Sequence, residues 1–236
     1  MMPNKMSSWR DKLHYHLLFR HCSLCQLPLT TTDYFWCDYC LSQFPIHPYC
    51  QHCGSTTVTS VIACGHCLTK PPLWHRLYRL GEYRPPLQQL VHQLKFCGKF
   101  WLARPLAQQL AQHITQPAPL LLPVPLHWRR YCQRGFNQSH QLALALGDIF
   151  NSRVDTQAFK RLRHTPSQQQ LSKFQRHHNL HHAFQLRTIT LPSHVAIVDD
   201  VVTTGATVHQ LTELLILQGV KKVDIYTLCH TEQSVN

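Results

Sequence analysis

The segment over residues 195–207, VAIVDDVVTTGAT, constrains the fold of this chain more than any other part of the sequence. It begins with four consecutive apolar residues, which is typical of a strand buried on both faces of a parallel sheet. Two acids, Asp199 and Asp200, follow at once, and a turn rich in hydroxyl groups comes at residues 203–207. The segment therefore predicts a buried strand that ends in a cluster of polar groups.

The residues after this turn complete a strand-helix-strand unit. An apolar-rich helix is predicted over residues 208–218, where Gly219 gives a stop signal, and a second strand is predicted over residues 223–228. The two acids then lie at the carboxyl end of a strand and near the amino end of a helix, where α/β sheets bind ligands. Only 11 of the 236 residues are acidic, so two adjacent acids here indicate binding rather than solubility.

The polar groups of this segment fit a ribose phosphate. Backbone N–H groups and hydroxyls of residues 203–207, at the positive end of a helix dipole, can surround a phosphate monoester. Asp199 and Asp200 are acceptors only, so they suit a ribose diol or a Mg²⁺ ion with its waters. A phosphate and a diol at that separation describe ribose 5-phosphate.

The middle of the chain supplies further elements of an α/β fold. Helices are predicted over residues 87–95, 102–114 and 138–150 from the spacing of their apolar residues. A short apolar run at residues 120–122 is stopped by Pro123, which indicates a buried strand that leads into a loop. We therefore expect a parallel sheet flanked by helices.

Eight of the eleven cysteines form four Cys-x-x-Cys pairs within one short stretch. Two such pairs complete the tetrahedral Cys₄ shell that Zn²⁺ prefers, so eight thiolates predict two zinc sites. The predicted ligands are Cys22, Cys25, Cys37, Cys40, Cys50, Cys53, Cys64 and Cys67. Four thiolates leave no open position for catalysis, so both ions are expected to be structural. The remaining Cys97, Cys132 and Cys229 are predicted to be small buried hydrophobic residues.

The spacing of the pairs allows either sequential pairing or an interleaved cross-brace. Residues 30–36 and 56–62 are rich in β-branched and aromatic residues, as ribbon strands are, whereas residues 41–49 carry two prolines, like a linker. The local sequence therefore favours sequential pairing in a double zinc ribbon. Disulfides or redox-active dithiols are the alternatives, which the regular pairs and the lack of an export signal disfavour.

Composition divides the chain into an N-terminal segment over residues 1–20, the zinc ribbons over residues 21–70, and a larger domain over residues 71–236. Charged residues mix with the apolar positions at the start, and no apolar run approaches the ~20 residues that span a bilayer, so we expect a cytoplasmic protein without membrane insertion. The net charge of +12 favours a polyanionic partner, either a nucleic acid or a small phosphorylated ligand.

The sequence of residues 195–207 closely resembles the phosphoribosyl-pyrophosphate signature of type I phosphoribosyltransferases. The resemblance implies that Asp199 and Asp200 bind the ribose hydroxyls. It further implies that the turn binds the 5′-phosphate through Thr203, Thr204, Gly205, Ala206 and Thr207. Phosphoribosyl pyrophosphate with Mg²⁺ is then the expected ligand, in a type I phosphoribosyltransferase-like α/β domain preceded by a small Cys₄ zinc-ribbon domain.

The wider pattern is similar to the ComF/GntX family, whose members are linked to competence and the use of external DNA. The residues that carry this resemblance are the Cys-x-x-Cys pairs, Leu94-Lys95-Phe96, Pro123-Val124-Pro125-Leu126, Arg134-Gly135-Phe136-Asn137-Gln138, Thr165-Pro166, Gln168, Arg176 and Asn179. The family fold implies that the loop with Val124 and Pro125 binds pyrophosphate through backbone N–H groups. Arg129, Arg130 and Arg134 can neutralise it, although the first two can equally be surface charges. The candidate catalytic residues are therefore Asp199, Asp200 and Arg134.

The stretch from Lys160 to Phe184 resembles the mobile catalytic loop in its position. Its candidate residues are Arg163, His164, Lys173, Arg176, His177, His178, His181 and His182. The four clustered histidines can make a metal site or contact nucleic acid, but solvated loop residues are the favoured interpretation.

Two functions remain open at this point. One is an enzyme in which an acceptor attacks C1 of phosphoribosyl pyrophosphate and pyrophosphate leaves, with Mg²⁺ as a template. No residue stands out as a base for a particular acceptor. The other is a non-catalytic nucleic-acid-binding or adaptor protein that keeps the fold, with single-stranded DNA or DNA-uptake proteins as partners.

Overall fold

The computed structural model describes residues 21–29, 35–162, 183–187 and 190–231. The chain divides into two compact units, Met1–Phe44 and Pro45–Asn236. The first Cys group, with Cys22 and Cys40, lies in the first unit, and the second, with Cys50 and Cys67, lies in the second unit together with the sheet. The sequence placed the boundary later, after residue 70.

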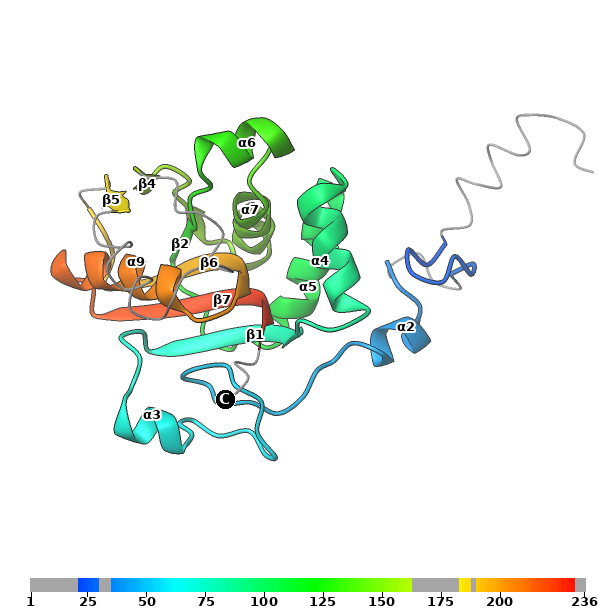
Figure 1. Cartoon of the computed structure of the whole chain (residues 1–236), viewed down its shortest axis with the longest axis horizontal. Coiled ribbons are helices and arrows are strands. Elements are labelled where there is room, and N and C mark those ends of the chain that lie inside the picture. Colours follow the sequence, from blue (N-terminus) through cyan, green and yellow to red (C-terminus); the bar gives the residue numbers. More distant parts are fainter. Residues whose placement is uncertain (1–20, 30–34, 163–182, 188–189, 232–236) are drawn as a thin grey trace, which may run out of the picture. The chain divides into compact units, whose positions relative to one another are not determined.

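A five-stranded parallel sheet forms the centre of the second unit (Figure 1). Its strands, in spatial order, are β1 (Arg76–Glu82), β7 (Lys222–His230), β6 (His194–Val202), β2 (Leu120–Pro123) and β3 (Arg153–Val154). Every neighbouring pair is parallel, and Val198 of β6 lies between Tyr226 of β7 and Pro123 of β2. The parallel α/β sheet predicted from the sequence is confirmed.

Helices cover both faces of this sheet. The long ones are α4 (Leu87–Phe96), α5 (Ala103–Ala111), α7 (Gln138–Phe150) and α9 (Ala206–Leu217). Val195 and Ile197 of β6 belong to one core cluster with Val208 and Leu211 of α9, whereas α7 packs against β2 and β6. Residues 195–198 are all fully buried, which explains why this strand reads as a continuous apolar run.

The remaining elements of this unit are shorter. A 3₁₀ turn, η1 (Phe100–Leu102), follows α4, and α6 (Trp128–Arg134) follows β2. Strands β4 (Phe159–Arg161) and β5 (Phe184–Leu186) form a separate antiparallel pair. None of the described helices is long and apolar enough to cross a membrane.

The eight paired cysteines form two groups in sequential order, as the local sequence favoured. Within each group, the four sulfur atoms all lie within 4.8 Å of one another. Short helices begin beside the later pair of each group, α2 (Asp38–Ser42) and α3 (Gly65–Thr69). The prediction of a strand over residues 56–62 is wrong, because Thr56 and Val61 make only isolated β-bridges. Residues 30–34 of the other expected strand lie outside the described residues.

The three unpaired cysteines do not share one environment. Cys229, in strand β7 between β1 and β6, is fully buried as expected. Cys97 and Cys132 are exposed, so the prediction that they are buried is wrong. Cys97 is the residue that ends α4, and Cys132 lies on α6, a helix in which no residue is buried.

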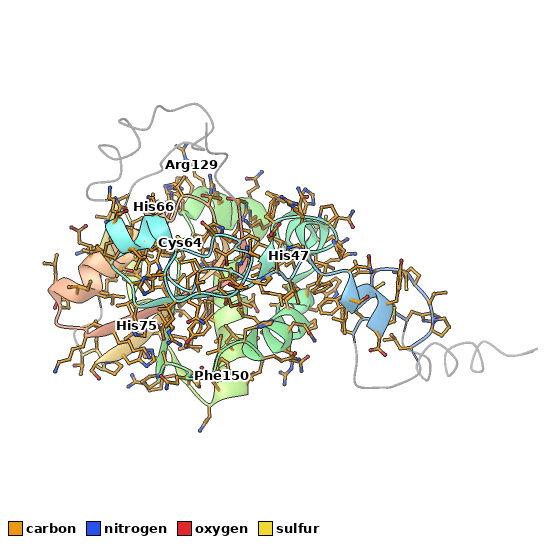
Figure 2. The ribbon with its side chains drawn as sticks, turned by 90° about the horizontal axis from the view of Figure 1, so that it is seen from below. His47, Cys64, His66, His75, Arg129 and Phe150 are labelled. Atoms are coloured by element: carbon orange, nitrogen blue, oxygen red, sulfur yellow. The ribbon has the colours of Figure 1, made fainter. Side chains whose placement is uncertain are left out.

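The second Cys group is attached along β1. It lies below β1 in Figure 1, and Figure 2 views it from that side, with Cys64 and His66 labelled. Arg79 of β1 is 1% exposed and donates to Thr56 Oγ1 at 2.9 Å, and Thr56 in turn donates to Glu82 Oε1 at 2.6 Å. The charged groups of β1 therefore face a buried polar network beneath the sheet.

Candidate functional site

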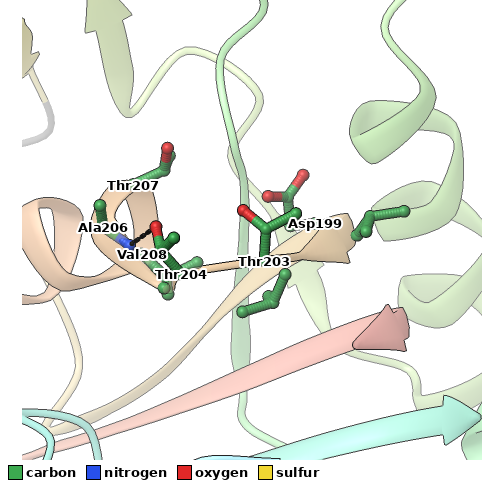
Figure 3. A pocket seen from close by; sticks show the side chains of 9 residues that line it. Asp199, Thr203, Thr204, Ala206, Thr207 and Val208 are labelled. Atoms are coloured by element: carbon green, nitrogen blue, oxygen red, sulfur yellow. Dashed lines mark hydrogen bonds between the residues drawn. The ribbon is translucent and has the colours of Figure 1, made fainter. Parts of the chain in front are cut away.

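The hydroxyl-rich turn joins β6 to α9 and lines a pocket. Figure 3 shows the hydroxyls of Thr203, Thr204 and Thr207 around this turn, with the carboxylate of Asp199 beside them. The pocket is lined by Asp199, Val201, Val202, Thr203, Thr204, Gly205, Ala206, Thr207 and Val208. The structure thus brings Asp199 and all five predicted turn residues to one place.

The local sequence explains the shape of this turn. Gly205 has φ +72°, a left-handed conformation that favours glycine, and α9 begins at the next residue. The backbone N–H of Ala206 donates to Thr204 Oγ1 at 3.4 Å. The first backbone N–H groups of a helix lack partners within the helix, so the start of α9 can bind an anion.

Asp199 has the partners expected of a ligand-binding carboxylate. Its Oδ1 accepts from Ser139 Oγ at 3.0 Å and from the backbone N–H of Asp200 at 2.9 Å. Burial, together with the neighbouring charge of Asp200, raises the pKa of Asp199 to about 7. A cation or a hydroxyl donor brought by a ligand would stabilise its ionised form.

Asp200 lies in a different environment. It is 4% exposed, and it does not line the pocket. Its Oδ2 lies 3.1 Å from Nζ of Lys95, whose side chain is itself mostly buried. The sequence assigned both acids to the ribose, whereas the structure places one in the pocket and the other in an internal ion pair.

Lys95 is a site residue to which the sequence analysis gave no role. It lies in the last turn of α4, where Leu94 is fully buried and Phe96 is exposed. The guanidinium of Arg134 lies 4.6 Å from the centre of the Phe96 ring. Burial lowers the pKa of Arg134, and the charge of Asp200 opposes that effect. Two cations therefore accompany the buried carboxylate of Asp200.

The loop that follows β2 is fixed next to Asp199. The backbone N–H of Val124 donates to the carbonyl of Val198 at 2.9 Å, and Asn137 Nδ2 donates to the carbonyl of Val124 at 2.9 Å. Asn137 Oδ1 also accepts from the backbone N–H of Ser139 at 3.0 Å, which caps α7. One side chain thus joins the loop with Val124 and Pro125 to the helix that carries Ser139.

The predicted arginines after this loop lie on α6. Arg129 is exposed, is labelled at the margin in Figure 2, and packs its guanidinium 5.4 Å from the centre of the Trp128 ring. Arg130 is partly buried, and its charge lowers the pKa of Arg134. The structure therefore brings Arg130 toward the site and leaves Arg129 on the surface.

Arg161 is a second cation that sequence reasoning missed. It ends β4, and its guanidinium lies 5.4 Å from the centre of the Phe184 ring on β5. Burial lowers the pKa of Arg161, as does the charge of Arg130, while Asp199 raises it. These strands flank residues 163–182, so the candidate residues Arg163, His164, Lys173, Arg176, His177, His178, His181 and His182 lie outside the described residues.

The two Cys groups fit zinc by their chemistry and spacing. The sulfur atoms of Cys25 and Cys37 are 3.7 Å apart, and those of Cys53 and Cys64 are 3.8 Å apart. A tetrahedron with Zn–S bonds of about 2.3 Å has edges of about 3.8 Å. Burial opposes ionisation of Cys64, but hydrogen bonds from the backbone of Cys67 and from the other thiols outweigh it and lower its pKa to about 7.

Comparison with known proteins identifies the family. Residues 133–235 match the family described as phosphoribosyl transferase domain. The chain is 39% identical to the DNA utilization protein YhgH of Salmonella typhimurium over 219 residues, which cover 89% of this chain and 96% of that relative. The chain belongs to the ComF/GntX family. It is also 34% identical to Competence protein F of Haemophilus influenzae, covering 81% of this chain and 89% of that one, and 26% identical to Competence protein ComFC of Streptococcus pneumoniae, covering 86% and 90%.

Three of the motifs that resemble the ComF/GntX family, at residues 94–96, 123–126 and 134–138, meet near the end of β6. Lys95 of the motif at residues 94–96 pairs with Asp200. Phe96 of the same motif packs against Arg134 of the motif at residues 134–138. Asn137 then joins that motif to Val124. Sequence segments far apart in the chain therefore build one site around the end of β6.

Proposed function

We propose that the protein binds phosphoribosyl pyrophosphate with Mg²⁺ at the carboxyl edge of the sheet. The observation that carries the proposal is the pocket in which Asp199 lies beside the turn of residues 203–207, at the start of α9. A carboxylate beside an anion-binding helix start matches the two ends of a ribose 5-phosphate. The match to the phosphoribosyl transferase domain supports the same ligand.

Each part of the site has a role in this proposal. The N–H groups and hydroxyls of the turn bind the 5′-phosphate, and Asp199 accepts a hydrogen bond from a ribose hydroxyl. Asp200 holds Lys95 and Arg134 near the leaving pyrophosphate. The Val124 N–H is bound to Val198 and Pro125 has none, so the backbone donors to the pyrophosphate would come from the residues after Pro125. Mg²⁺ with its waters would be held beside Asp199 and would supply charge neutralisation for the bound ligand.

The reaction open to this ligand is attack by an acceptor nucleophile on C1. A bond forms between the nucleophile and C1, the bond from C1 to the pyrophosphate oxygen breaks, and pyrophosphate leaves with the electron pair. The chain contributes orientation of the ribose and stabilisation of the leaving charge.

Calorimetric titration of phosphoribosyl pyrophosphate with Mg²⁺ tests the binding step. We expect the wild type to bind and Asp199→Asn to bind at least ten-fold more weakly. Asp148→Asn is the matched control, because Asp148 is exposed and pairs only loosely with Arg104 at 3.6 Å. A folded wild type that does not bind, or equal losses in the two variants, would overturn the proposal.

A second candidate function is binding of single-stranded nucleic acid, which a specific surface favours. We define the aromatic face as Phe96, Phe100, Trp101 and Phe136. Phe96, Phe100 and Trp101 are 59%, 53% and 53% exposed. The Phe100 ring centre lies 5.6 Å from that of Trp101 and 6.2 Å from that of Phe136. Exposed rings beside cations such as Arg134 are the groups on which unpaired bases stack.

Fluorescence anisotropy with a labelled oligothymidylate tests this second function. We expect binding that weakens steeply with salt. The double substitution Phe100→Ala/Trp101→Ala should lower the binding free energy by about 1–3 kcal/mol for each base that no longer stacks. Tyr39→Ala is the control, because Tyr39 is 72% exposed and lies in the other unit. Binding that is unaffected by loss of the aromatic face would exclude that face as the nucleic-acid site.

A further inference from the structure

Trp74 connects the second Cys group to the phosphate turn. Its Nε1 donates to the carbonyl of His52 at 2.6 Å, and His52 lies between the ligands Cys50 and Cys53. The far side of the ring lies against Gly205, since a Cβ built on that glycine would be 3.0 Å from Cη2 of Trp74. One side chain therefore contacts both a predicted zinc knuckle and the turn that lines the pocket.

The Trp74 ring packs with the residues at both ends of the turn. Trp74 is 8% exposed and belongs to the same core cluster as Val202 and Val208, the residues on either side of the turn. Gly205 combines a left-handed φ of +72° with close approach of the ring, so a larger residue there is disfavoured for two reasons. The indole of Trp74 therefore packs against the turn at Gly205 and beside both of its ends.

The backbone on both sides of this contact is also fixed. The N–H of His75, the next residue, donates to the carbonyl of Val223 at 2.7 Å, which attaches this stretch to β7. The N–H of Leu77 donates to the carbonyl of Gln51 at 2.7 Å. A Cβ at Gly54 would lie only 2.8 Å from Cδ2 of Leu77, so the knuckle packs tightly on β1. Displacement of the knuckle would therefore move the carbonyl of His52, which accepts the hydrogen bond from Trp74 Nε1.

We propose that Trp74 is a positioning residue for the phosphate turn, and that metal binding by the second Cys group holds Trp74 in place through the carbonyl of His52. The consequence for ligand affinity rests on the proposed function; the effect on the turn itself does not. The first Cys group belongs to the other unit and is expected to have no such effect. The two groups thus have different roles although their ligand sets are the same.

Hydrogen exchange of the ligand-free full chain tests the positioning role without any substrate. We expect Trp74→Ala to speed exchange of the backbone amides over residues 201–208 at least ten-fold. Trp74→Phe keeps a ring but loses the N–H donor, so exchange should lie between that of Trp74→Ala and the wild type. Trp101→Ala, which removes an exposed indole, should leave these amides unchanged. Unchanged exchange in Trp74→Ala would overturn the proposal.

Matched cysteine variants test the contribution of the metal. We expect Cys64→Ser and Cys25→Ser each to lower the zinc content by one ion per chain. Exchange over residues 201–208 should rise only in Cys64→Ser. Equal exchange in the two variants would overturn the link from the second Cys group to the turn. Should Cys64→Ser fail to fold, Trp74→Phe with its full zinc content still tests the hydrogen bond to His52.

Titration with phosphoribosyl pyrophosphate and Mg²⁺ separates this inference from the proposed function. We expect at least ten-fold weaker binding by Trp74→Ala and partial recovery in Trp74→Phe, with wild-type affinity in Cys25→Ser. A wild type that does not bind overturns the proposed function alone, because exchange in the ligand-free chain reports on the turn independently. Full affinity in Trp74→Ala overturns the positioning role.

Discussion

At the scale of single residues, two adjacent acids have different partners. Asp199 lines the pocket and is bound by Ser139, whereas Asp200 is buried beside Lys95. The sequence alone does not separate them, because the partners come from α7 and α4, which are remote from β6 along the chain. Strand β6 thus presents one carboxylate to the pocket and pairs the next with Lys95 inside the fold.

The raised pKa of Asp199 makes the stability of the ligand-free protein depend on pH. Its pKa of about 7 in the folded chain lies above the unfolded value, so the folded state holds more protons between about pH 4 and pH 7. The stability that protonated Asp199 contributes is therefore lost as the pH rises through 7. We expect Asp199→Asn to be more stable than the wild type at pH 8, by more than about 1 kcal/mol, and the gain to shrink at pH 5.

Urea unfolding of both proteins at pH 5 and pH 8 measures this difference. Asp148→Asn serves as the control, because that carboxylate is exposed. A gain for Asp199→Asn that is the same at both pH values would contradict the titration of Asp199.

The ion pair of Lys95 and Asp200 gives a second prediction. Lys95→Met leaves a carboxylate that is 4% exposed without its nearest cation. We expect a loss of unfolding free energy of about 3–5 kcal/mol, because removing one partner leaves the other charge buried and unpaired. Lys95→Met/Asp200→Asn should recover part of that loss in a double-mutant cycle measured by urea unfolding. A double variant less stable than Lys95→Met would show that the pair is not the source of the effect.

At the scale of elements, the sequence predicts those with a regular apolar pattern. Helix α7 spans the predicted residues 138–150, and α9 and β7 lie within two residues of the predicted bounds. Strand β1 was missed, because RLYRLGE has no β-branched residue and carries charges that only the buried polar network satisfies. Short strands such as β4 and β5 depend on pairing with each other, which local sequence does not encode.

The candidate site was predictable only in part for the same reason. The turn of residues 203–207 and Asp199 are local to one motif, so the sequence finds them together. Lys95, Arg161 and Trp74 come from other elements and reach the site only through tertiary packing. The motif at residues 94–96 marks Lys95, but its pairing with Asp200 is a tertiary contact that no local pattern reveals.

The two Cys groups give a prediction about independent metal sites. Because each group lies within one compact unit, loss of one should leave the other intact. We expect two zinc ions per chain in the wild type and one in each of Cys22→Ser and Cys50→Ser, measured by metal analysis of the purified full chain. Loss of both ions on a single substitution would show instead that the two sites depend on each other.

Asn137 links the loop after β2 to α7 through two separate hydrogen bonds. We expect Asn137→Ala to lower the unfolding free energy by about 1–2 kcal/mol, because it removes the cap of α7. Asn137→Asp keeps an acceptor for the Ser139 N–H but loses the donor to the Val124 carbonyl. It should retain most of the stability yet weaken binding of pyrophosphate with Mg²⁺, measured by calorimetry. Equal affinity in the wild type and Asn137→Asp would remove the loop from the proposed pyrophosphate site.

At the scale of the whole molecule, the net charge of +12 serves two proposed ligands through different surfaces. In these proposals the pocket of Asp199 binds a small phosphorylated sugar and the aromatic face binds unpaired bases. We expect Asp199→Asn to lose the sugar ligand and keep oligothymidylate, and Phe100→Ala/Trp101→Ala to do the reverse. Salt should weaken the oligonucleotide more steeply, since an extended backbone releases more counterions than a compact ligand. Calorimetry and anisotropy on the same protein samples measure both, and a single variant that loses both ligands while folded would mean that they share one site.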